Sequence, residues 1–192
     1  NETGFVLCDS LGGRGLAQIV PFKWWIESED FYAPTDIRNS KYSIKRDWYY
    51  NNPATPELFG KKCEVTEETW SKCSVFPTIT KFNYGKTDDD PAYAGNNKDR
   101  MKFRLAETYL LLAEARLQQG NTQGAAEAIN VVRKRAGAPE ITASQATIDF
   151  LLDERIRELV GEELRRFTLV RTGKLVERTR KYNSYSSKID EP

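Results

Sequence analysis

Residues 103–117 have the sequence FRLAETYLLLAEARL, in which apolar side chains return every three or four positions. The recurring positions are Phe103, Ala106, Leu110, Ala113 and Leu117. This spacing places them on one face of an α-helix. Gly120-Asn121 follows, and glycine readily adopts the positive φ that ends a helix. The stretch therefore predicts an amphipathic helix that ends at Gly120.

A second helix is expected directly after the first. Thr122 can cap its start, Gly137 ends it, and Pro139 prevents its continuation. Its buried face is formed by Ala125, Ala128, Ile129, Val132 and Ala136. The short connection predicts an antiparallel hairpin. Small residues at the helix contact, glycine at the turn and proline at the end resemble the tetratricopeptide pattern. About three copies of that pattern are needed for stability, and only one good copy is present here.

More helical sequence follows from residues 144–147 onward. Its apolar face consists of Ile148, Leu151, Leu152, Ile156 and Leu159. Gly161 is a weak point in this helix, and the apolar face continues after a bend through Leu164, Phe167 and Leu169. We expect Gly173 to end the stretch, a short turn over residues 174–178, and a polar loop over residues 181–192.

The first half of the chain has a different composition. Residues 1–99 contain all four tryptophans and most of the prolines and tyrosines, with little sustained periodicity. Short β-like pieces are expected at residues 5–7, 42–48 and 78–84. The predicted fold is mainly α, with a tetratricopeptide-like helix hairpin and further helices packed with a long irregular, loop-rich segment with minor β. We expect one domain over residues 1–192, made of a loop-rich aromatic part (1–99), a helical part (100–178) and a tail (179–192).

Bulk composition excludes several classes of function. The 29 basic and 28 acidic residues nearly cancel, so the chain has no overall field to attract nucleic acid. The sequence contains no histidine, which removes the commonest general base and the commonest metal ligand. No run approaches the roughly 20 apolar residues that a membrane-spanning helix needs.

Blocks of the second half resemble the SusD/RagB family in their order and spacing. Residues 104–115 are similar to its helix RxAExYLxxAEA, residues 129–137 to INxVRxRAG, and residues 152–159 to ILxERxREL. Residues 162–173 resemble a further block, ExxRxxDLxRxG, with Thr168 where the family usually has Asp.

The first half resembles the same family more loosely. Asp36-Ile37-Arg38 is similar to a DxR element that precedes the family's helices, and Lys81-Phe82 to a Lys-aromatic stretch. Members of the family have a larger N-terminal part with several more tetratricopeptide-like helix pairs. The sequence is therefore expected to be a C-terminal domain fragment of such a protein.

The resemblance implies a location and partners. SusD-like proteins are lipid-anchored at the extracellular face of the outer membrane of Gram-negative bacteria. Each pairs with a SusC-like TonB-dependent transporter and binds oligosaccharides or polysaccharides, or in some branches peptides, without hydrolysing them. We therefore expect nutrient uptake without catalysis, cofactor or metal. A membrane is expected to be reached only through a lipid anchor outside residues 1–192.

The candidate ligand-binding residues are aromatic, because flat rings stack on the C–H faces of sugars. They are Trp24, Trp25, Trp48, Tyr49 and Tyr50. The alternative is that these rings pack beneath the loops as a small core. Trp25, Tyr49 and Tyr50 are preferred, because adjacent side chains of extended chain cannot all point inward.

Charged residues gather between Glu154 and Arg171, and two interpretations compete for them. Paired carboxylates beside arginines can perform acid–base chemistry, as in a glycosidase. Opposite charges one helical turn apart also stabilise a helix. Ion pairs between two helices stabilise the packing of one helix against the other. We favour the structural interpretation, and expect Arg166→Ala to lower stability more than ligand binding.

Smaller features leave alternatives open. Cys63 and Cys73 either form a disulfide or remain separate thiols. Cys8 follows no apolar signal segment and is not interpreted as a lipid-attachment site. The acidic run at residues 88–90 is interpreted as a solvated turn rather than a calcium loop. Residues 12–15, GGRG, are interpreted as a turn rather than a phosphate loop.

The leading functional prediction is a non-catalytic glycan-capture protein. The binding residues are expected in loops 20–55, on a scaffold of helices from residues 100–175. The alternative is a tetratricopeptide-like module that binds a protein or peptide. Exposed rings in the loops would favour the first function, and an exposed groove on the helices would favour the second.

Overall fold

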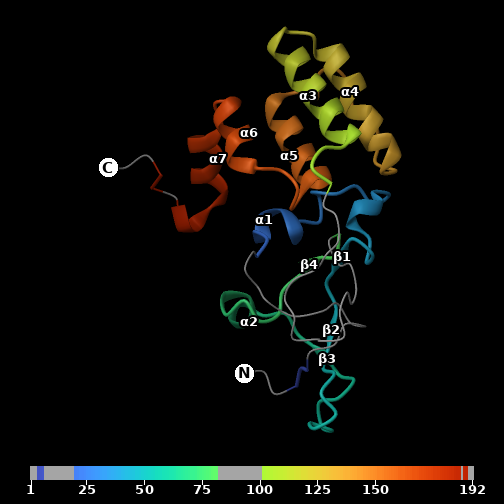
Figure 1. The fold of residues 1–192 in the computed structure, drawn as a ribbon, viewed down its shortest axis with the longest axis vertical. Coiled ribbons are helices and arrows are strands. Elements are labelled where there is room, and N and C mark those ends of the chain that lie inside the picture. The colour runs from blue at the N-terminus through green and yellow to red at the C-terminus, as the bar shows by residue number, and fades with distance from the viewer. Residues whose placement is uncertain (1–3, 7–19, 82–100, 187, 190–192) are drawn as a thin grey trace. The chain divides into compact units, whose positions relative to one another are not determined.

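The computed structural model describes residues 4–6, 20–81, 101–186 and 188–189. These residues form two compact units. Residues 4–6, 20–21 and 39–81 belong to the loop unit, and residues 22–38, 101–186 and 188–189 belong to the helical unit. Within the described residues helix far exceeds strand, which confirms the prediction of a mainly α fold (Figure 1).

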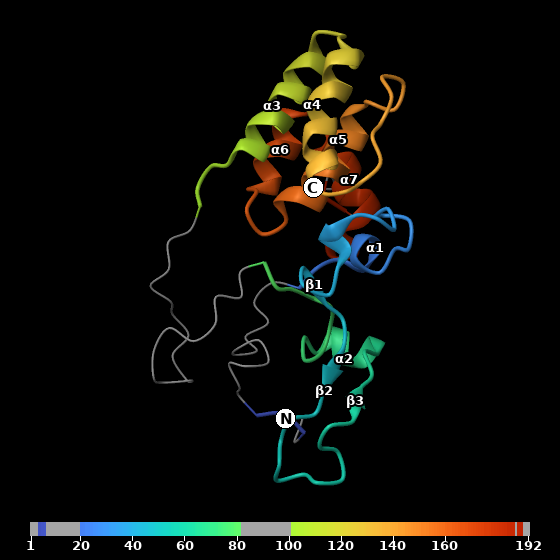
Figure 2. The same ribbon diagram turned by 90° about the vertical axis from the view of Figure 1, so that its right-hand side faces the viewer.

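The helical unit contains the predicted hairpin. Helix α3 covers Leu105–Gln118 and helix α4 covers Thr122–Arg135, and the two lie side by side (Figure 2). Gly120 has φ +74°, which closes the turn between them at little steric cost. The side chain of Asn121 accepts a hydrogen bond from the Gly124 amide at 2.8 Å. The start of α4 is therefore capped by Asn121, one residue before the predicted cap.

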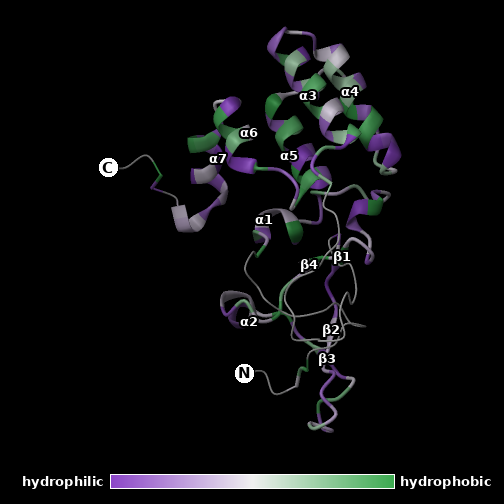
Figure 3. Cartoon of the chain, viewed as in Figure 1, coloured by the Kyte–Doolittle hydropathy of each residue, from purple (hydrophilic) through white to green (hydrophobic). Residues whose placement is uncertain are grey.

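The hydrophobic core of this unit lies among α3, α4 and helix α5, which covers Ile148–Leu159. Leu110, Ile129 and Leu151 are fully buried there. Alanines on α4 leave room for α3 to approach closely. Figure 3 shows green, hydrophobic stretches on all three helices among purple, hydrophilic ones. The prediction that the buried face of this helix starts at Phe103 is wrong for that residue, because Phe103 is among the most exposed large apolar side chains.

The C-terminal helices differ from the sequence-based prediction. The bend at Gly161, with φ +77°, divides two separate helices, because α6 begins only at Arg165 and covers Arg165–Arg171. Residues 174–178 do not form a simple turn: helix α7 covers Leu175–Tyr182, and a 3₁₀ turn, η3, covers Ser184–Ser186. Helix α7 was missed because it is mostly polar and its stabilising contacts come from other helices.

Residues 22–38 belong to the helical unit, although their composition resembles the loop-rich half. This segment contains helix α1, Lys23–Ile26, and the start of η2, Ile37–Asn39. The amide of Ile37 donates to the Ala136 carbonyl at 3.0 Å. A Cβ at Gly137, where φ is +69°, would lie 2.9 Å from the Thr35 carbonyl oxygen. The chain passes so close that position 137 requires glycine.

The loop unit contains four short strands in two antiparallel pairs. Strand β1 (Ile44–Lys45) pairs with β4 (Thr78–Ile79), and β2 (Trp48–Tyr49) pairs with β3 (Lys62–Cys63). Helix α2, Glu67–Ser71, has a capping box formed by Thr66 and Thr69. The β-like predictions at 42–48 and 78–84 correspond to β1, the start of β2 and β4, whereas β3 and α2 were not predicted.

The remaining sequence-based predictions concern the cysteines, two turns, membrane-spanning helices and the extent of the domain. Cys63 is a buried free thiol and Cys73 an exposed one, so the disulfide alternative is wrong for this structure. Cys8, residues 12–15 and residues 88–90 lie outside the described residues. In the described parts of the chain, we find no helix with the length and apolar character of a membrane span. The extent of the domain, residues 1–192, stays a prediction.

Candidate functional site

The five candidate aromatic residues are divided between the two units. Trp24 and Trp25 lie on α1 in the helical unit. Trp48 and Tyr49 form β2 in the loop unit, and Tyr50 follows them. Each group is therefore considered within its own unit.

The two tryptophans of α1 pack inside the helical unit. The Trp24 ring stacks on Tyr182 at the end of α7, with centroids 4.0 Å apart and planes 22° apart. Phe31 meets the same Trp24 ring edge-on at 5.4 Å. Trp25 is only 5% exposed. Packing accounts for both rings, and Trp25, a preferred candidate, offers no open face to a ligand in this structure.

Strand β2 sends its neighbouring side chains to opposite sides, as extended chain must. Trp48 is half-buried, and its indole N–H donates to the Phe76 carbonyl at 3.0 Å. The Lys45 ammonium lies 4.0 Å from the centroid of the Trp48 ring. Opposite Trp48 in the β2–β3 register is Cys63, which is buried. Trp48 therefore belongs to the inner side of the strand.

Tyr50 is held by the N-terminal residues of the loop unit. Its ring centroid lies 5.0 Å from that of Phe5. A Cβ built at Gly4 would fall 2.2 Å from Tyr50 Cδ1, so the ring lies directly against the glycine backbone. The amide of Tyr50 also donates to the Lys61 carbonyl, which extends the β2–β3 pairing by one residue.

Tyr49 is the one candidate of the five that is mostly exposed, at 53%. Its partner across the β2–β3 pair is Lys62, and side chains directly opposite each other share a face of the sheet. The Lys62 ammonium makes a 2.8 Å ion pair with Asp47, two residues before Tyr49. The hydrogen bond and charge of Asp47 raise the pKa of Lys62. We call Asp47, Tyr49 and Lys62 the Tyr49 face.

Sequence reasoning identified part of this face. Tyr49 was a preferred candidate, and Asp47 lies within the loop region expected to bind. Lys62 was missed, because only the strand pairing brings it beside Tyr49. A lysine thirteen residues away along the chain carries no local signal of that contact.

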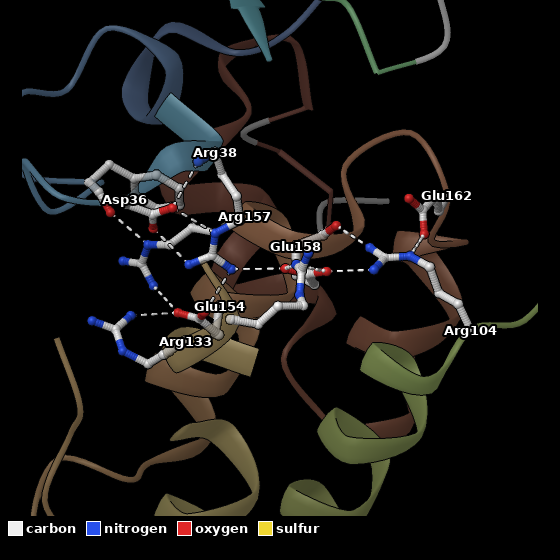
Figure 4. A network of polar contacts seen from close by, with 10 residues as sticks. Asp36, Arg38, Arg104, Arg133, Glu154, Arg157, Glu158 and Glu162 are labelled. Atoms are coloured by element: carbon white, nitrogen blue, oxygen red, sulfur yellow. Dashed lines mark hydrogen bonds and ion pairs between the residues drawn. The ribbon is translucent and has the colours of Figure 1, made fainter. Parts of the chain in front are cut away.

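The charged block forms a buried network in the helical unit (Figure 4). Its two central carboxylates are Glu154 and Glu158 on α5, with side chains 0% and 1% exposed. The network also includes a carboxylate in the N-terminal segment, another just after α5, and guanidinium groups from several parts of the unit. Its further members are Asp36, Arg38, Arg104, Arg133, Arg135, Arg157 and Glu162.

Arg38 joins the N-terminal segment to α5. Its Nε and Nη2 donate to the two Asp36 carboxylate oxygens at 2.8 and 2.7 Å. Its Nη1 donates to Glu154 at 2.9 Å and to Glu158 at 3.1 Å. Burial acts to lower the pKa of Arg38, but its hydrogen bond to Asp36 and the charge of Glu154 raise the pKa above its ordinary value.

Each central carboxylate has further arginine partners. Glu154 accepts from Arg133 at 2.7 Å and from Arg157 at 3.0 Å. Glu158 accepts from Arg104 at 2.5 Å and from Arg135 at 2.7 Å. Charge-assisted hydrogen bonds on all sides offset the cost of burying these groups.

The network supports the structural interpretation of the charged block. A general acid or base must reach a substrate proton, whereas Glu154 and Glu158 are buried and fully engaged by arginines. Arg166 is a different case: it is exposed, and no ion pair to it is seen among the described residues. The expectation that Arg166→Ala lowers stability therefore has no support here. The arginines whose ion pairs stabilise the helical unit are instead Arg38, Arg104 and Arg133.

Acid should weaken this network. Burial acts to raise the pKa of Glu158, but the hydrogen bond from Arg104 and the charges of Arg135 and Arg104 bring it below the ordinary 4.5. Because the pKa is depressed on folding, the stabilisation is complete above about 4.5 and is lost as the pH falls through the folded-state value. Urea denaturation should show the stability gap between wild type and Glu158→Gln shrinking below about pH 4.5. A gap that stays constant from about pH 7 to 3 would contradict this.

Metal binding has no support within residues 4–6, 20–81, 101–186 and 188–189. No three or more cysteine, aspartate or glutamate side chains there are grouped so that they could hold a metal ion.

The motifs that build the network coincide with a family pattern. The SusD family matches residues 27–191, a range that includes every member of the network. The chain therefore belongs to the SusD family, whose members are non-catalytic binding proteins.

Two relatives are SusD-like proteins of Formosa agariphila. SusD-like protein P38 is 30% identical over 82% of this chain, and SusD-like protein P25 is 33% identical over 53% of it. The matched part makes up 29% and 20% of those relatives, so the chain spans less than a third of either. A solved structure, that of BT4246, is 29% identical over 71% of this chain and 17% of its own, with a TM-score of 0.36.

Proposed function

We propose that this protein captures glycans at the extracellular face of the outer membrane, without cleaving them, and passes them to a SusC-like TonB-dependent transporter. Membership of the SusD family supports the general role. The proposal also takes two properties from the family. These are the attachment to the membrane through a lipid anchor and the partnership with a transporter.

The observation that carries the proposal is the Tyr49 face. A half-exposed phenol ring can stack on the apolar C–H face of a sugar. The Asp47 carboxylate and the Lys62 ammonium beside it, 2.8 Å apart, can accept from and donate to sugar hydroxyls. Binding sites commonly combine an aromatic surface with a few convergent polar groups in this way.

Truncation of Tyr49 should abolish most glycan binding. We expect Tyr49→Ala to weaken affinity at least about tenfold, the loss typical of an aromatic anchor. A glycan array identifies a ligand for the chain, and calorimetry compares the variants. Tyr185→Ala is the matched control, since Tyr185 is an exposed tyrosine of the helical unit at 89%. Equal affinity of wild type and Tyr49→Ala would overturn the assignment of this face.

The alternative function is binding of a protein or peptide by the helix hairpin. The observation in its favour is the exposure of Leu105, Leu111 and Leu112 on α3, because exposed apolar side chains on one element often mark a contact surface. Binding of peptides that is lost in Leu105→Ser and Leu112→Ser, with no glycan bound, would favour this function over glycan capture.

A further inference from the structure

Aromatic rings of the loop unit have lysines beside them. The Lys41 ammonium lies 5.3 Å from the centroid of the Tyr42 ring, which is highly exposed. The Lys45 ammonium lies 4.0 Å from that of Trp48. Tyr49 faces Lys62 across the strand pair. Three different rings thus have a lysine as a neighbour.

A lysine beside a ring changes what the ring can bind. A neutral sugar gains from stacking on the ring and from hydrogen bonds, and any polar neighbour can supply the hydrogen bonds. A sugar with a carboxylate or sulfate group gains in addition from the ammonium, which is a compact point charge. Ring and ammonium together therefore favour a ligand that has both an apolar face and an anionic group.

We propose, on the basis of the glycan capture proposed above, that the Tyr49 face prefers anionic glycans, whose carboxylate or sulfate groups pair with Lys62. In the free protein Lys62 is paired with Asp47 at 2.8 Å. An anionic ligand competes with Asp47 for the ammonium and is repelled by the Asp47 carboxylate. The two members of this ion pair therefore have opposite effects on the ligand.

Because Lys62 and Asp47 have opposite effects on an anionic ligand, substitutions of the two residues should shift its affinity in opposite directions. A purely structural role of the ion pair would not produce opposite shifts. Lys62→Gln removes the attraction and should weaken binding of an anionic glycan about threefold or more. Asp47→Asn removes the competitor and should strengthen binding by a similar factor. If the ion pair served only to hold the β2–β3 strands, both substitutions would weaken binding in the same direction. Thermal unfolding of both variants checks that the loop unit stays folded, and Lys134→Gln on α4 is the control for net charge.

The experiment uses two pairs of polysaccharides, in each of which one member has the anionic group and the other has it esterified or removed. Polygalacturonate is compared with its methyl ester, and a sulfated galactan with its desulfated form, by calorimetry on the whole chain. The first pair tests carboxylates and the second tests sulfates. Affinity for the charged member should also fall as salt rises from about 0.05 to 0.5 M, because the screening length shortens.

The expected result is tighter binding of a charged member, with opposite shifts for Lys62→Gln and Asp47→Asn. Equal affinity for charged and neutral members, shifts in the same direction, or binding to neither member of either pair would overturn the anionic preference. Glycan capture itself would fail separately, through an array on which the chain binds no glycan. Unchanged glycan binding by Tyr49→Ala would leave glycan capture standing and would overturn the assignment of the site to the Tyr49 face.

Discussion

Glu154→Gln should lower the free energy of unfolding by about 3–5 kcal/mol, the range for breaking a buried ion pair by removing one partner. The Glu154 side chain is 0% exposed and its carboxylate accepts from Arg38, Arg133 and Arg157. The amide keeps the shape of the side chain but removes its charge. Three guanidinium groups would then share a buried region with one less counter-charge, and the amide would also present N–H donors to them.

Urea denaturation followed by circular dichroism measures this effect. Glu140→Gln is the matched control, because Glu140 is an exposed residue of the α4–α5 connection, and it should change stability by less than about 0.5 kcal/mol. A loss of under about 1 kcal/mol for Glu154→Gln would mean that the network contributes no more than surface ion pairs do.

Leu110→Ala should lower the free energy of unfolding by about 2–5 kcal/mol, through lost burial and the cavity left behind. Leu110 is 0% exposed in the core among α3, α4 and α5. The residues around it are mostly alanines and branched side chains on neighbouring helices. Such residues have few rotamers with which to fill the space.

Leu112→Ala provides the comparison on the same helix. Leu112 is exposed, so the same substitution should change stability by less than about 1 kcal/mol. The two variants differ in the face of α3 that they alter and not in helix propensity. Similar unfolding free energies for both would show that the buried face of α3 has been assigned to the wrong side.

The hairpin of α3 and α4 could be predicted from sequence because local signals agree there. The apolar repeat, Gly120 at the turn and Gly137 at the end all specify the same two helices. Helix α7 could not be predicted. Its eight residues make only about two helical turns, and its Arg178 pairs with Asp149 and Asp153 of α5, which the local sequence does not encode.

The short strands of the loop unit illustrate the same limit. Each consists of two residues, so no alternating pattern can develop within it. Their pairing is set by partners up to 35 residues away, as for Ile44 and Ile79. Residues 22–38 likewise resemble the loop-rich half in composition, and tertiary contacts such as the hydrogen bond from Ile37 to Ala136 and the ion pair of Arg38 with Glu154 reveal where they belong.

For the candidate site, the sequence by itself determined the residue types and one geometric limit. Three adjacent aromatic residues in extended chain must alternate, so at least one of Trp48, Tyr49 and Tyr50 faces outward. The tertiary structure decided which one: Trp48 donates to the Phe76 carbonyl, Tyr50 lies on Gly4, and Tyr49 remains exposed.

The sequence also determined that the second half carries the charged motifs of the SusD family, since these are contiguous blocks. Only the tertiary structure decided which charges meet. Arg38 reaches Glu154 across 116 residues of sequence, and Tyr49 meets Lys62 through strand pairing. The physical reason is that helix periodicity depends on neighbours within a few residues, whereas an ion pair or strand partner depends on the path of the whole chain.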